Sequence, residues 1–416
     1  MKDLASISRW LYFRRYARAA EKLSYNKLEV LGPEHEFSLV NNEMKPMPIA
    51  EEIVNEYYGK ISNALHLTRY AIRIEFPLHI VEIKARNPFN SPELLEESMQ
   101  AAVTSFLEFI TNKYHANLLG TGMHPILRLE ETGIRPNDKI AQELSKAFPL
   151  RRHGWLNIQS FQLNLPYSTE EEAVSLHNAL THLCAYLPAI SASSPICEGH
   201  FTPYDDFRLH NYQMKCREIP SIAGDVVPEY ISSFNQFRNE VSERYSSDLS
   251  NVGVSIDDFA DYVNQRNVVF KFARKAIEIR VMDEQECIKS DVALSCFIRS
   301  TIRGLLALND EPLSHKILVN DYNSIIKNGL EAEVLNPKGK TARQICQYFF
   351  KLASEYADEK EKKYLWIIEK RIKEGNLSKL IRRRVVNRAQ KTTFDEAVIC
   401  VYSELARCVS DNQPYF

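Results

Sequence analysis

The chain has 416 residues, with 52 Lys and Arg against 54 Asp and Glu, a formal net charge of -2 and 44% hydrophobic residues. These values are typical of a folded soluble protein, and the near-zero charge disfavours a nucleic-acid binder with a wholly basic surface. With 13 glycines and 18 prolines the composition is also unlike that of a fibrous or low-complexity protein. Because a single core stops growing at roughly 250–300 residues, we expect one large domain with an appendage, or two domains.

Three features of the sequence bear on the cellular location of the protein. The N-terminal residues 1–15 lack the apolar core of a secretion signal, and their pattern favours a basic amphipathic helix packed on the domain. The 8 cysteines include no C-x-x-C pair, so we expect free thiols and a cytoplasmic location. Residues 175–197 contain no Asp, Glu, Lys or Arg, but their two prolines favour a buried helix ending near Pro188 over a membrane span.

Five segments alternate apolar and polar residues with the period of two that is typical of a β-strand. They cover residues 34–39, 72–76, 81–84, 161–165 and 277–281. In each segment the apolar phase is suited to packing against helices. We expect the opposite phases to bring five carboxylates to one concave face: Glu34, Glu36, Glu75, Glu82 and Glu278.

The spacing between Glu75 and Glu82 tests this expectation. Seven residues is an odd number, so one continuous strand would place the two carboxylates on opposite faces. Pro77 lies between them, and a proline is excluded from a central strand. We therefore expect residues 76–79 to form a turn that resets the phase.

Helical periodicity is clear in residues 92–113, where Leu95, Met99 and Val103 belong to one apolar stripe and Ser91 is a suitable N-cap. The same periodicity recurs in residues 291–308, 341–356 and 361–372, and loop chemistry occurs at residues 309–312, 336–339 and 375–376. The pattern predicts an α+β fold over the first 300 residues and an almost wholly helical C-terminal part.

Five carboxylates on one face repel each other, and burial would raise their pKa values until some protonate, unless cations neutralise them. Oxygen ligands without cysteine favour Mg2+ or Mn2+ over zinc. The residues alone leave another interpretation open. The acids could lie on a solvated antiparallel face, paired with Lys84, Arg73 and Arg280.

Six motifs follow one another along the chain. They are GPEHEF at 32–37, Glu75 with VEIK at 81–84, GTGMHP at 120–125, QLNL at 162–165, LPAISASSP at 187–195 with Glu198 and Gly199, and AIEIRVMD at 276–283. In this order they resemble the glutamate-cysteine ligase family, especially its carboxylate-amine ligase branch, over roughly residues 30–300.

The resemblance implies a fold similar to that of glutamine synthetase. Its catalytic part is a curved antiparallel sheet of about six strands with helices packed on one face, around a cleft that binds ATP and Mg2+ or Mn2+. Applied to this chain, it predicts an N-terminal helical segment at residues 1–30, a catalytic domain at 31–308 and a helical C-terminal region at 309–416.

The resemblance also implies roles for individual residues. Metal ligands would be Glu34, Glu36, Glu75, Glu82, Gln162 and Glu278. Arg280 would be catalytic, stabilising the phosphoryl group in transfer. Substrate- or ATP-binding residues would be Arg208, Arg217, Asn164 and His124. Taken singly, either Arg208 or Arg217 also fits a surface salt bridge, and His124 fits a structural histidine.

Gln162 departs from the bacterial members of the family, many of which carry a metal-binding histidine there. The Gln-x-Asn pattern of Gln162 and Asn164 is similar to that of the plant glutamate-cysteine ligases. A glutamine carbonyl coordinates Mg2+ as a neutral oxygen, so activity is compatible with this change.

The function that the resemblance implies is that of an ATP-dependent ligase in glutathione biosynthesis. It would join glutamate or a related acid to an amine, cysteine by default, through an acyl phosphate. Two alternatives stay open: a non-catalytic nucleotide-binding or interaction protein on the same scaffold, and a ligase for another amine or acid. We expect small-molecule partners, no nucleic-acid or membrane partner, and allow a homo-oligomer. The basic residues 379–391 favour a solvated helix face.

Overall fold

The structure is a computed structural model that describes residues 25–61, 70–136, 138–255, 263–308 and 311–416. The basic helix expected at residues 1–15 lies outside this part of the chain.

All eight cysteines are free thiols, as predicted. Among the described helices, none has the length and apolarity needed to cross a membrane. Residues 175–184 of the segment without charged residues belong to a helix that begins at Glu170 and ends at Cys184. A second, short helix begins at Pro188, because proline suits the first helical position.

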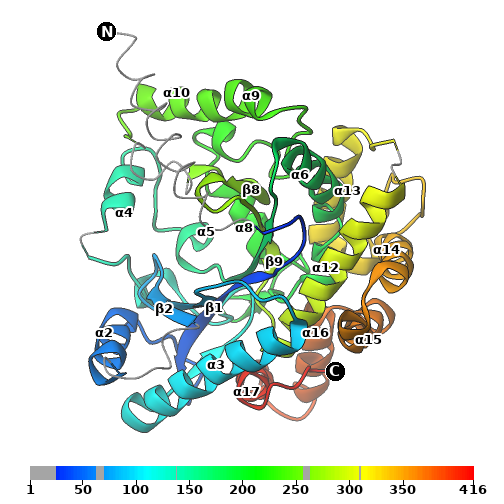
Figure 1. The fold of residues 1–416 in the computed structure, drawn as a ribbon. Helices are drawn as coiled ribbons and strands as arrows, with labels where there is room; N and C mark the ends of the chain where they lie inside the picture. Colours follow the sequence, from blue (N-terminus) through cyan, green and yellow to red (C-terminus); the bar gives the residue numbers. More distant parts are fainter. Residues whose placement is uncertain (1–24, 62–69, 137, 256–262, 309–310) are drawn as a thin grey trace.

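A seven-stranded antiparallel sheet forms the centre of the described part of the protein (Figure 1). Its order is β2-β3-β1-β5-β9-β8, and β4 pairs with β1. The strands are β1 (Gly32–Asn41), β2 (Tyr70–Ile74), β3 (Ile80–Ala85), β4 (Ala116–Leu119), β5 (Ser160–Pro166), β8 (Val268–Lys271) and β9 (Ala276–Asp283). All five predicted strands are present. The sequence pattern missed β8 because its four residues are all buried and show no alternation.

The register of the sheet brings the polar phases of different strands together. Glu34 of β1 lies opposite Lys84 of β3, and Glu36 lies opposite Glu82. On its other side β1 pairs with β5, where Glu34 lies opposite Gln162. Directly opposite residues point to the same face of a sheet. The predicted polar face is therefore present.

The turn at Pro77 resets the phase between β2 and β3, as expected. β2 ends at Ile74, β3 begins at Ile80, and the amide of Ile80 donates to the carbonyl oxygen of Pro77 at 3.3 Å. Within the ladder Arg73 lies opposite Glu82. Since Glu75 is two residues beyond Arg73, it keeps the phase of Glu82.

A bulge interrupts the pairing of β5 with β9. Leu163 lies opposite Ile279, but Phe161 lies opposite Met282, so β9 contains one extra residue here. The extra residue turns Met282 toward the apolar core, where it is fully buried, and gives Asp283 the phase of Ser160 on the polar face.

Long helices cover the apolar face of the sheet: α3 (Pro92–Tyr114), α6 (Glu170–Cys184) and α12 (Ile288–Leu308). The predicted N-cap of α3 is correct, because the Ser91 hydroxyl accepts a hydrogen bond from the amide of Leu94. Shorter helices lie along the polar face or the edges of the fold: α2 (Ala50–Ile61), α4 (Lys139–Leu144), α5 (His153–Leu156), α7 (Pro188–Ser191), α8 (Phe207–Met214), α9 (Phe234–Gln236) and α10 (Glu243–Asn251).

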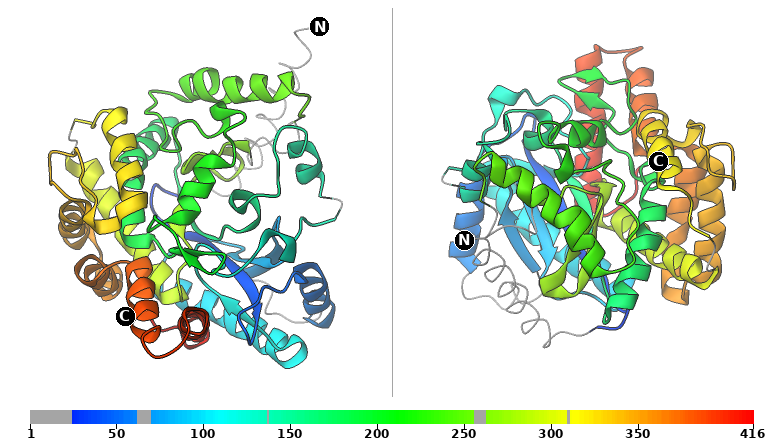
Figure 2. Two further views of the ribbon diagram at one scale, coloured as in Figure 1. Left: turned by 180° about the vertical axis from the view of Figure 1, so that it is seen from behind. Right: turned by 90° about the horizontal axis from the view of Figure 1, so that it is seen from above.

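The C-terminal region is helical, as predicted, and its helices gather on one side of the molecule (Figure 2). They are α13 (His315–Asn328), α14 (Ala342–Tyr356), α15 (Glu359–Glu374), α16 (Leu377–Arg388) and α17 (Phe394–Asp411). Leu318 and Ile345 belong to the same buried cluster as the strands. α16 and α17 build a second cluster with Val40 of β1 and Leu119 of β4. The domain boundary at residue 308 stays a prediction.

Candidate functional site

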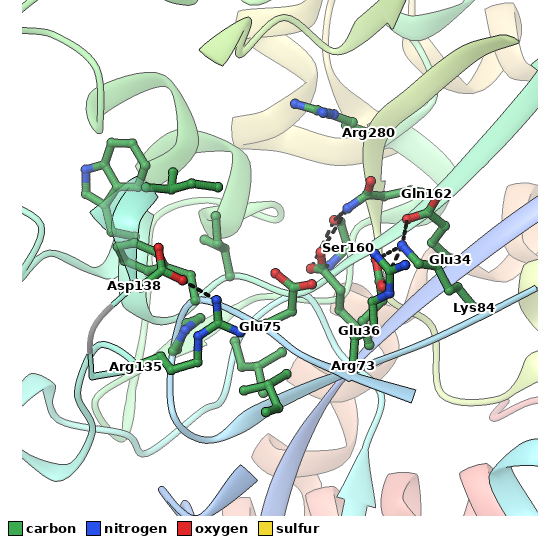
Figure 3. Close-up of a pocket in the computed structure, with 18 of the residues that line it drawn as sticks. Glu34, Glu36, Arg73, Glu75, Lys84, Arg135, Asp138, Ser160, Gln162 and Arg280 are labelled. Atoms are coloured by element: carbon green, nitrogen blue, oxygen red, sulfur yellow. Dashed lines mark hydrogen bonds and ion pairs between the residues drawn. The ribbon is translucent and has the colours of Figure 1, made fainter. Parts of the chain in front are cut away.

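A cavity of about 610 Å³ lies over the polar face of the sheet. Its floor comes from the strands β1, β2, β3, β5 and β9, and its walls come from α2, α4, α5 and α8. Predicted site residues that line it are Glu34, Glu36, Glu75, Glu82, Gln162, Arg208, Glu278 and Arg280. Figure 3 shows Glu75 in the middle of this cavity, between the Arg135 side and the strands that carry Glu36 and Gln162.

Lys84 joins two of the five glutamates. Its Nζ atom lies 2.9 Å from Oε2 of Glu34 and 2.7 Å from Oε2 of Glu82. Burial opposes the ionisation of Glu34, but Lys84 outweighs this effect and the pKa of Glu34 is lowered. For Glu82, burial and the neighbouring charge of Glu34 together raise the pKa well above its ordinary value. The pair Glu34 and Glu82 therefore shares one lysine.

Glu36 and Glu75 lack such a counter-ion. The amide of Ser160 donates to Oε2 of Glu36 at 2.7 Å, yet burial still raises the pKa of Glu36. Burial and the nearby Glu36 raise the pKa of Glu75 to about 8. Among the described residues, none forms an ion pair with either carboxylate within the distances of a salt bridge. These two carboxylates are therefore the ones whose ionised form has no basic partner among the described residues.

Arg280 and Glu278 form an ion pair on β9, with Nε of Arg280 2.5 Å from Oε1 of Glu278. Lys271 approaches the same carboxylate oxygen at 3.3 Å. Burial opposes the ionisation of Glu278, but Arg280 and Lys271 outweigh it and lower its pKa. Nη1 of Arg280 also donates to the carbonyl oxygen of Asn264 at 3.1 Å. The guanidinium is thereby fixed at the edge of the cavity (Figure 3).

The amides of Gln162 and Asn164 bind glutamates of the neighbouring strand. Nε2 of Gln162 donates to Oε1 of Glu36 at 2.8 Å. Nδ2 of Asn164 donates to Oε1 of Glu34 at 3.1 Å. Asn164 is not among the residues that line the cavity, so it reaches the site through Glu34.

Arg208 is buried, with 1% of its surface exposed. Its Nε atom lies 2.5 Å from Oδ1 of Asp283, and Nη2 donates to the carbonyl oxygen of Val281 at 2.7 Å. Val281 belongs to the bulged part of β9. Arg208 thus ties α8 to the bulge, and it also lines the cavity.

Two predicted binding residues do not line the cavity. Arg217 is exposed, and Nε lies 3.5 Å from Oε1 of its neighbour Glu218. It follows the end of α8, where the chain leaves the cavity. His124 is fully buried, and its Nδ1 accepts a hydrogen bond from the amide of Leu127 at 3.1 Å. Burial lowers the pKa of His124 to about 3, which favours the neutral imidazole.

Several cavity residues were not predicted: Ser160, Lys215, Lys271 and Arg274. Arg274 reaches Oε1 of Glu34 from a short turn after β8, with its Nη1 atom at 3.1 Å. Ser160 shares the phase of Gln162 on β5, so the alternation could have identified it. The basic residues had no such signal, because Lys271 ends the fully buried strand β8, Arg274 lies in the turn after it, and Lys215 caps α8.

The donor set fits Mg2+ or Mn2+. Carboxylate oxygens and an amide line one cavity, which contains no cysteine sulfur atom other than that of Cys216, and hard divalent cations prefer oxygen ligands. Glu34, Glu82 and Glu278 have basic partners, as in the alternative interpretation, but all three are buried and do not lie on a solvated face. Glu36 and Glu75 have no such partner among the described residues. A divalent cation would favour the ionised form of both.

Behind the polar face, β1 contributes a residue to a buried polar network. Nδ1 of His35 lies 3.1 Å from Oδ2 of Asp291 and 3.5 Å from Oε1 of Glu284, and all three residues are fully buried. Oε2 of Glu284 accepts the backbone amide of Glu36 at 3.0 Å. The network connects the central strand to the beginning of α12 and so supports the position of Glu36.

Comparisons with known proteins agree with the resemblance seen in the sequence. The family described as glutamate-cysteine ligase family 2 matches residues 30–402. A protein of Archaeoglobus fulgidus, named only as uncharacterized, is 39% identical over 388 residues, which are 93% of this chain and 100% of that protein.

Solved structures show the same fold at low sequence identity. A glutamate-cysteine ligase from Francisella tularensis, in complex with AMP, has a TM-score of 0.61 and 12% identity, over 93% of this chain and 90% of that one. A bifunctional glutathione synthetase from Pasteurella multocida has a TM-score of 0.53 and 11% identity, over 94% of this chain and 53% of that one. These likenesses confirm the predicted fold class.

Proposed function

The chain belongs to glutamate-cysteine ligase family 2, and on this basis we propose that it is an ATP-dependent ligase that joins a carboxylic acid to an amine. The acid is glutamate or a related acid, and the amine is cysteine by default. The observation that carries the proposal is the charge pattern of the cavity. Carboxylates suited to divalent cations face basic side chains suited to phosphate and carboxylate groups. The Francisella ligase, described with AMP, supports a nucleotide as one substrate.

In the proposed reaction a carboxylate oxygen attacks the γ-phosphorus of ATP, giving an acyl phosphate and ADP. The amine nitrogen then attacks the acyl carbon, and the C–O bond to phosphate breaks as the amide forms. Arg280 stabilises the phosphoryl group with its planar guanidinium, which Glu278 and Asn264 hold in place. Lys271 and Arg274 offset the negative charge of the bound substrates.

The residues that would hold Mg2+ or Mn2+ are Glu34, Glu36, Glu75, Glu82, Gln162 and Glu278. When bound, the cation neutralises charge on the triphosphate and orients its terminal group. The chain prepares the site by fixing Glu36 between the Ser160 amide and the Gln162 side chain. An arrangement that exists before the substrates bind needs little reorganisation during the reaction.

The opposite wall of the cavity is apolar, and it serves a second need of the reaction. Ile140, Phe148 and Trp155 line the cavity from α4 and its neighbours along the chain. An acyl phosphate is hydrolysed easily, so a wall that excludes water protects it until the amine arrives. The ion pair of Arg135 with Asp138 lies at the same side (Figure 3).

The test is a turnover assay on the full chain with ATP, Mg2+, glutamate and a panel of amines, cysteine first. We expect ADP release that requires both acid and amine, and a product whose mass is that of the acid plus the amine minus one water. Glu75→Gln should abolish the activity. Glu93→Gln is the matched control, because Glu93 pairs with Lys363 on the surface. Tight ATP binding without turnover for any acid and amine would instead favour the non-catalytic alternative.

A further inference from the structure

Lys215 is a buried lysine whose ammonium group faces two aromatic rings. It caps the C-terminal end of α8 and lines the cavity, with 5% of its surface exposed. Its Nζ atom lies 3.9 Å from the ring centre of Tyr212 and 4.8 Å from that of Trp155. No carboxylate among the described residues forms an ion pair with it within salt-bridge distance. A buried lysine in such surroundings is unusual, because lysines are seldom buried without a partner.

The packing of α5 on α8 builds this environment. A Cβ atom on Gly154 would lie 2.4 Å from the carbonyl oxygen of Asn211 and 2.8 Å from Cβ of Lys215. Only a glycine therefore allows α5 to approach α8 so closely. The next residue, Trp155, then lies against Lys215. The close packing of α5 on α8 therefore holds the Lys215 side chain in place, unlike the flexible side chain of a surface lysine.

Burial disfavours the protonated form of Lys215, whereas the charges around it act in both directions. The titratable groups that act on it are Cys216, Arg280, Arg208 and Glu36. Burial has the largest effect, the two arginines act in the same direction, and Cys216 and Glu36 oppose them; together they lower the pKa of Lys215 to about 7. At neutral pH a large fraction of the side chain is a neutral amine.

The second half of the proposed reaction requires a base. An amine substrate in solution is mostly an ammonium ion, which has no lone pair for attack on the acyl phosphate. Among the described residues that line the cavity there is no histidine, the side chain that most often accepts a proton near neutral pH. The carboxylates of the cavity are the proposed cation ligands, except for that of Asp138, which forms an ion pair with Arg135. Lys215 remains as a basic group that is neutral in part and open to the cavity.

We propose that Lys215 accepts the proton of the incoming amine, a role that rests on the proposed ligase function. Nζ of the neutral lysine takes one proton from the substrate nitrogen and becomes an ammonium group. The nitrogen lone pair forms the C–N bond, phosphate leaves with the electron pair of the C–O bond, and the second proton lost by the nitrogen goes to the departing phosphate. The positive charge formed on Lys215 then lies in the cavity that holds the departing phosphate.

The test compares two nucleophiles that differ in their need for a base. Hydroxylamine is already neutral at pH 7, whereas cysteine carries an ammonium group. With ATP, Mg2+ and glutamate, Lys215→Met should lower amide formation with cysteine by about 100-fold or more, and should change hydroxamate formation with hydroxylamine by less than about threefold. Loss of both reactions to the same extent would mean that Lys215 holds an anionic substrate, and the proposal would be wrong.

Two variants sharpen the comparison. Lys215→Arg keeps the positive charge but cannot give up its proton, so it should resemble Lys215→Met; full activity in Lys215→Arg would overturn the role as a base. Lys271→Met is the matched control, since this lysine lies in the same cavity beside Glu278. If Lys271→Met lowers the rate of product formation, it should do so by the same factor with cysteine and with hydroxylamine.

A direct measurement on the unmodified protein does not depend on turnover. The rate of acetylation of Lys215 by acetic anhydride, followed by mass spectrometry across pH, should have its midpoint near 7. A midpoint near that of the surface lysines would contradict the proposal. If the wild-type protein makes neither product with glutamate, while Lys215 still titrates near neutral pH, it is the proposed function with glutamate that fails.

Discussion

Nε2 of Gln162 donates a hydrogen bond to Oε1 of Glu36 at 2.8 Å. The position at which this chain departs from the bacterial pattern therefore touches one of the two glutamates that have no basic partner. The amide nitrogen faces Glu36, so the amide oxygen is the atom left to approach a cation. Substitutions at Gln162 should act on the metal site and on Glu36 together.

Gln162 can be tested by three substitutions. Gln162→Glu adds a negative charge and should strengthen binding of free Mn2+, Gln162→Leu should weaken it, and Gln162→His should shift the activity ratio toward Mn2+ because imidazole suits later metals better than Mg2+. The measurement is turnover with each cation, together with calorimetric binding of Mn2+. If the Mg2+ to Mn2+ ratio stays flat in all three variants, Gln162 only supports Glu36 by its hydrogen bond.

Arg280→Lys separates charge from shape at the proposed phosphoryl site. Lysine can keep the ion pair with Glu278, but it loses the planar fork that also reaches the carbonyl oxygen of Asn264. We expect kcat to fall by about two orders of magnitude, with an unchanged melting temperature. An unchanged kcat would remove Arg280 from the mechanism.

Binding of a cation should release protons, because Glu36 and Glu75 have raised pKa values in the metal-free protein. A ligand carboxylate must be ionised, so Mn2+ binding at pH 7 displaces the proton of Glu75, whose pKa is about 8. Calorimetric titrations in buffers of different ionisation enthalpy should detect about one proton or more per bound ion. The release should shrink in Glu75→Gln. Heats that do not depend on the buffer would show that the two carboxylates are already ionised.

The raised pKa of Glu75 also predicts how stability depends on pH. Between the ordinary value of 4.5 and about 8, the folded protein holds a proton on Glu75 that the unfolded chain has released. By linkage, this contribution to stability is fully present below the lower value and is lost as the pH rises toward the upper one. In EDTA, the melting temperature of the wild type relative to Glu75→Gln should therefore fall from pH 5 to pH 8. A difference that does not change with pH would contradict the raised pKa.

Arg208 and Arg217 should behave differently, although the sequence suggested the same role for both. Arg208→Met leaves Asp283 buried without its partner, and breaking a buried ion pair in this way costs about 3–5 kcal/mol. Arg217→Ala removes an exposed side chain and should cost less than about 1 kcal/mol. Denaturant unfolding of the two variants measures the difference. Equal losses would mean that Arg217 has a partner outside this structure.

The sequence by itself determined the polar face of the sheet. Alternation with a period of two depends only on neighbouring residues, so the phases of Glu34 and Glu36, or of Glu278 and Arg280, could be assigned without the fold. Pro77 even allowed the odd spacing between Glu75 and Glu82 to be interpreted correctly, because proline limits the local backbone in any context. The Ser91 cap of α3 was predictable for the same reason.

The tertiary structure decided which residues far apart in the chain meet. The bulge in β9 turns Asp283 toward Arg208, and no local pattern marks that bulge. His124 and Arg217 follow family motifs, yet one lies in the core and the other in solvent. Lys215 faces the cavity because Gly154 lets α5 approach α8. Burial and the charges of distant neighbours set the chemistry of such a group, and both exist only once the chain has folded.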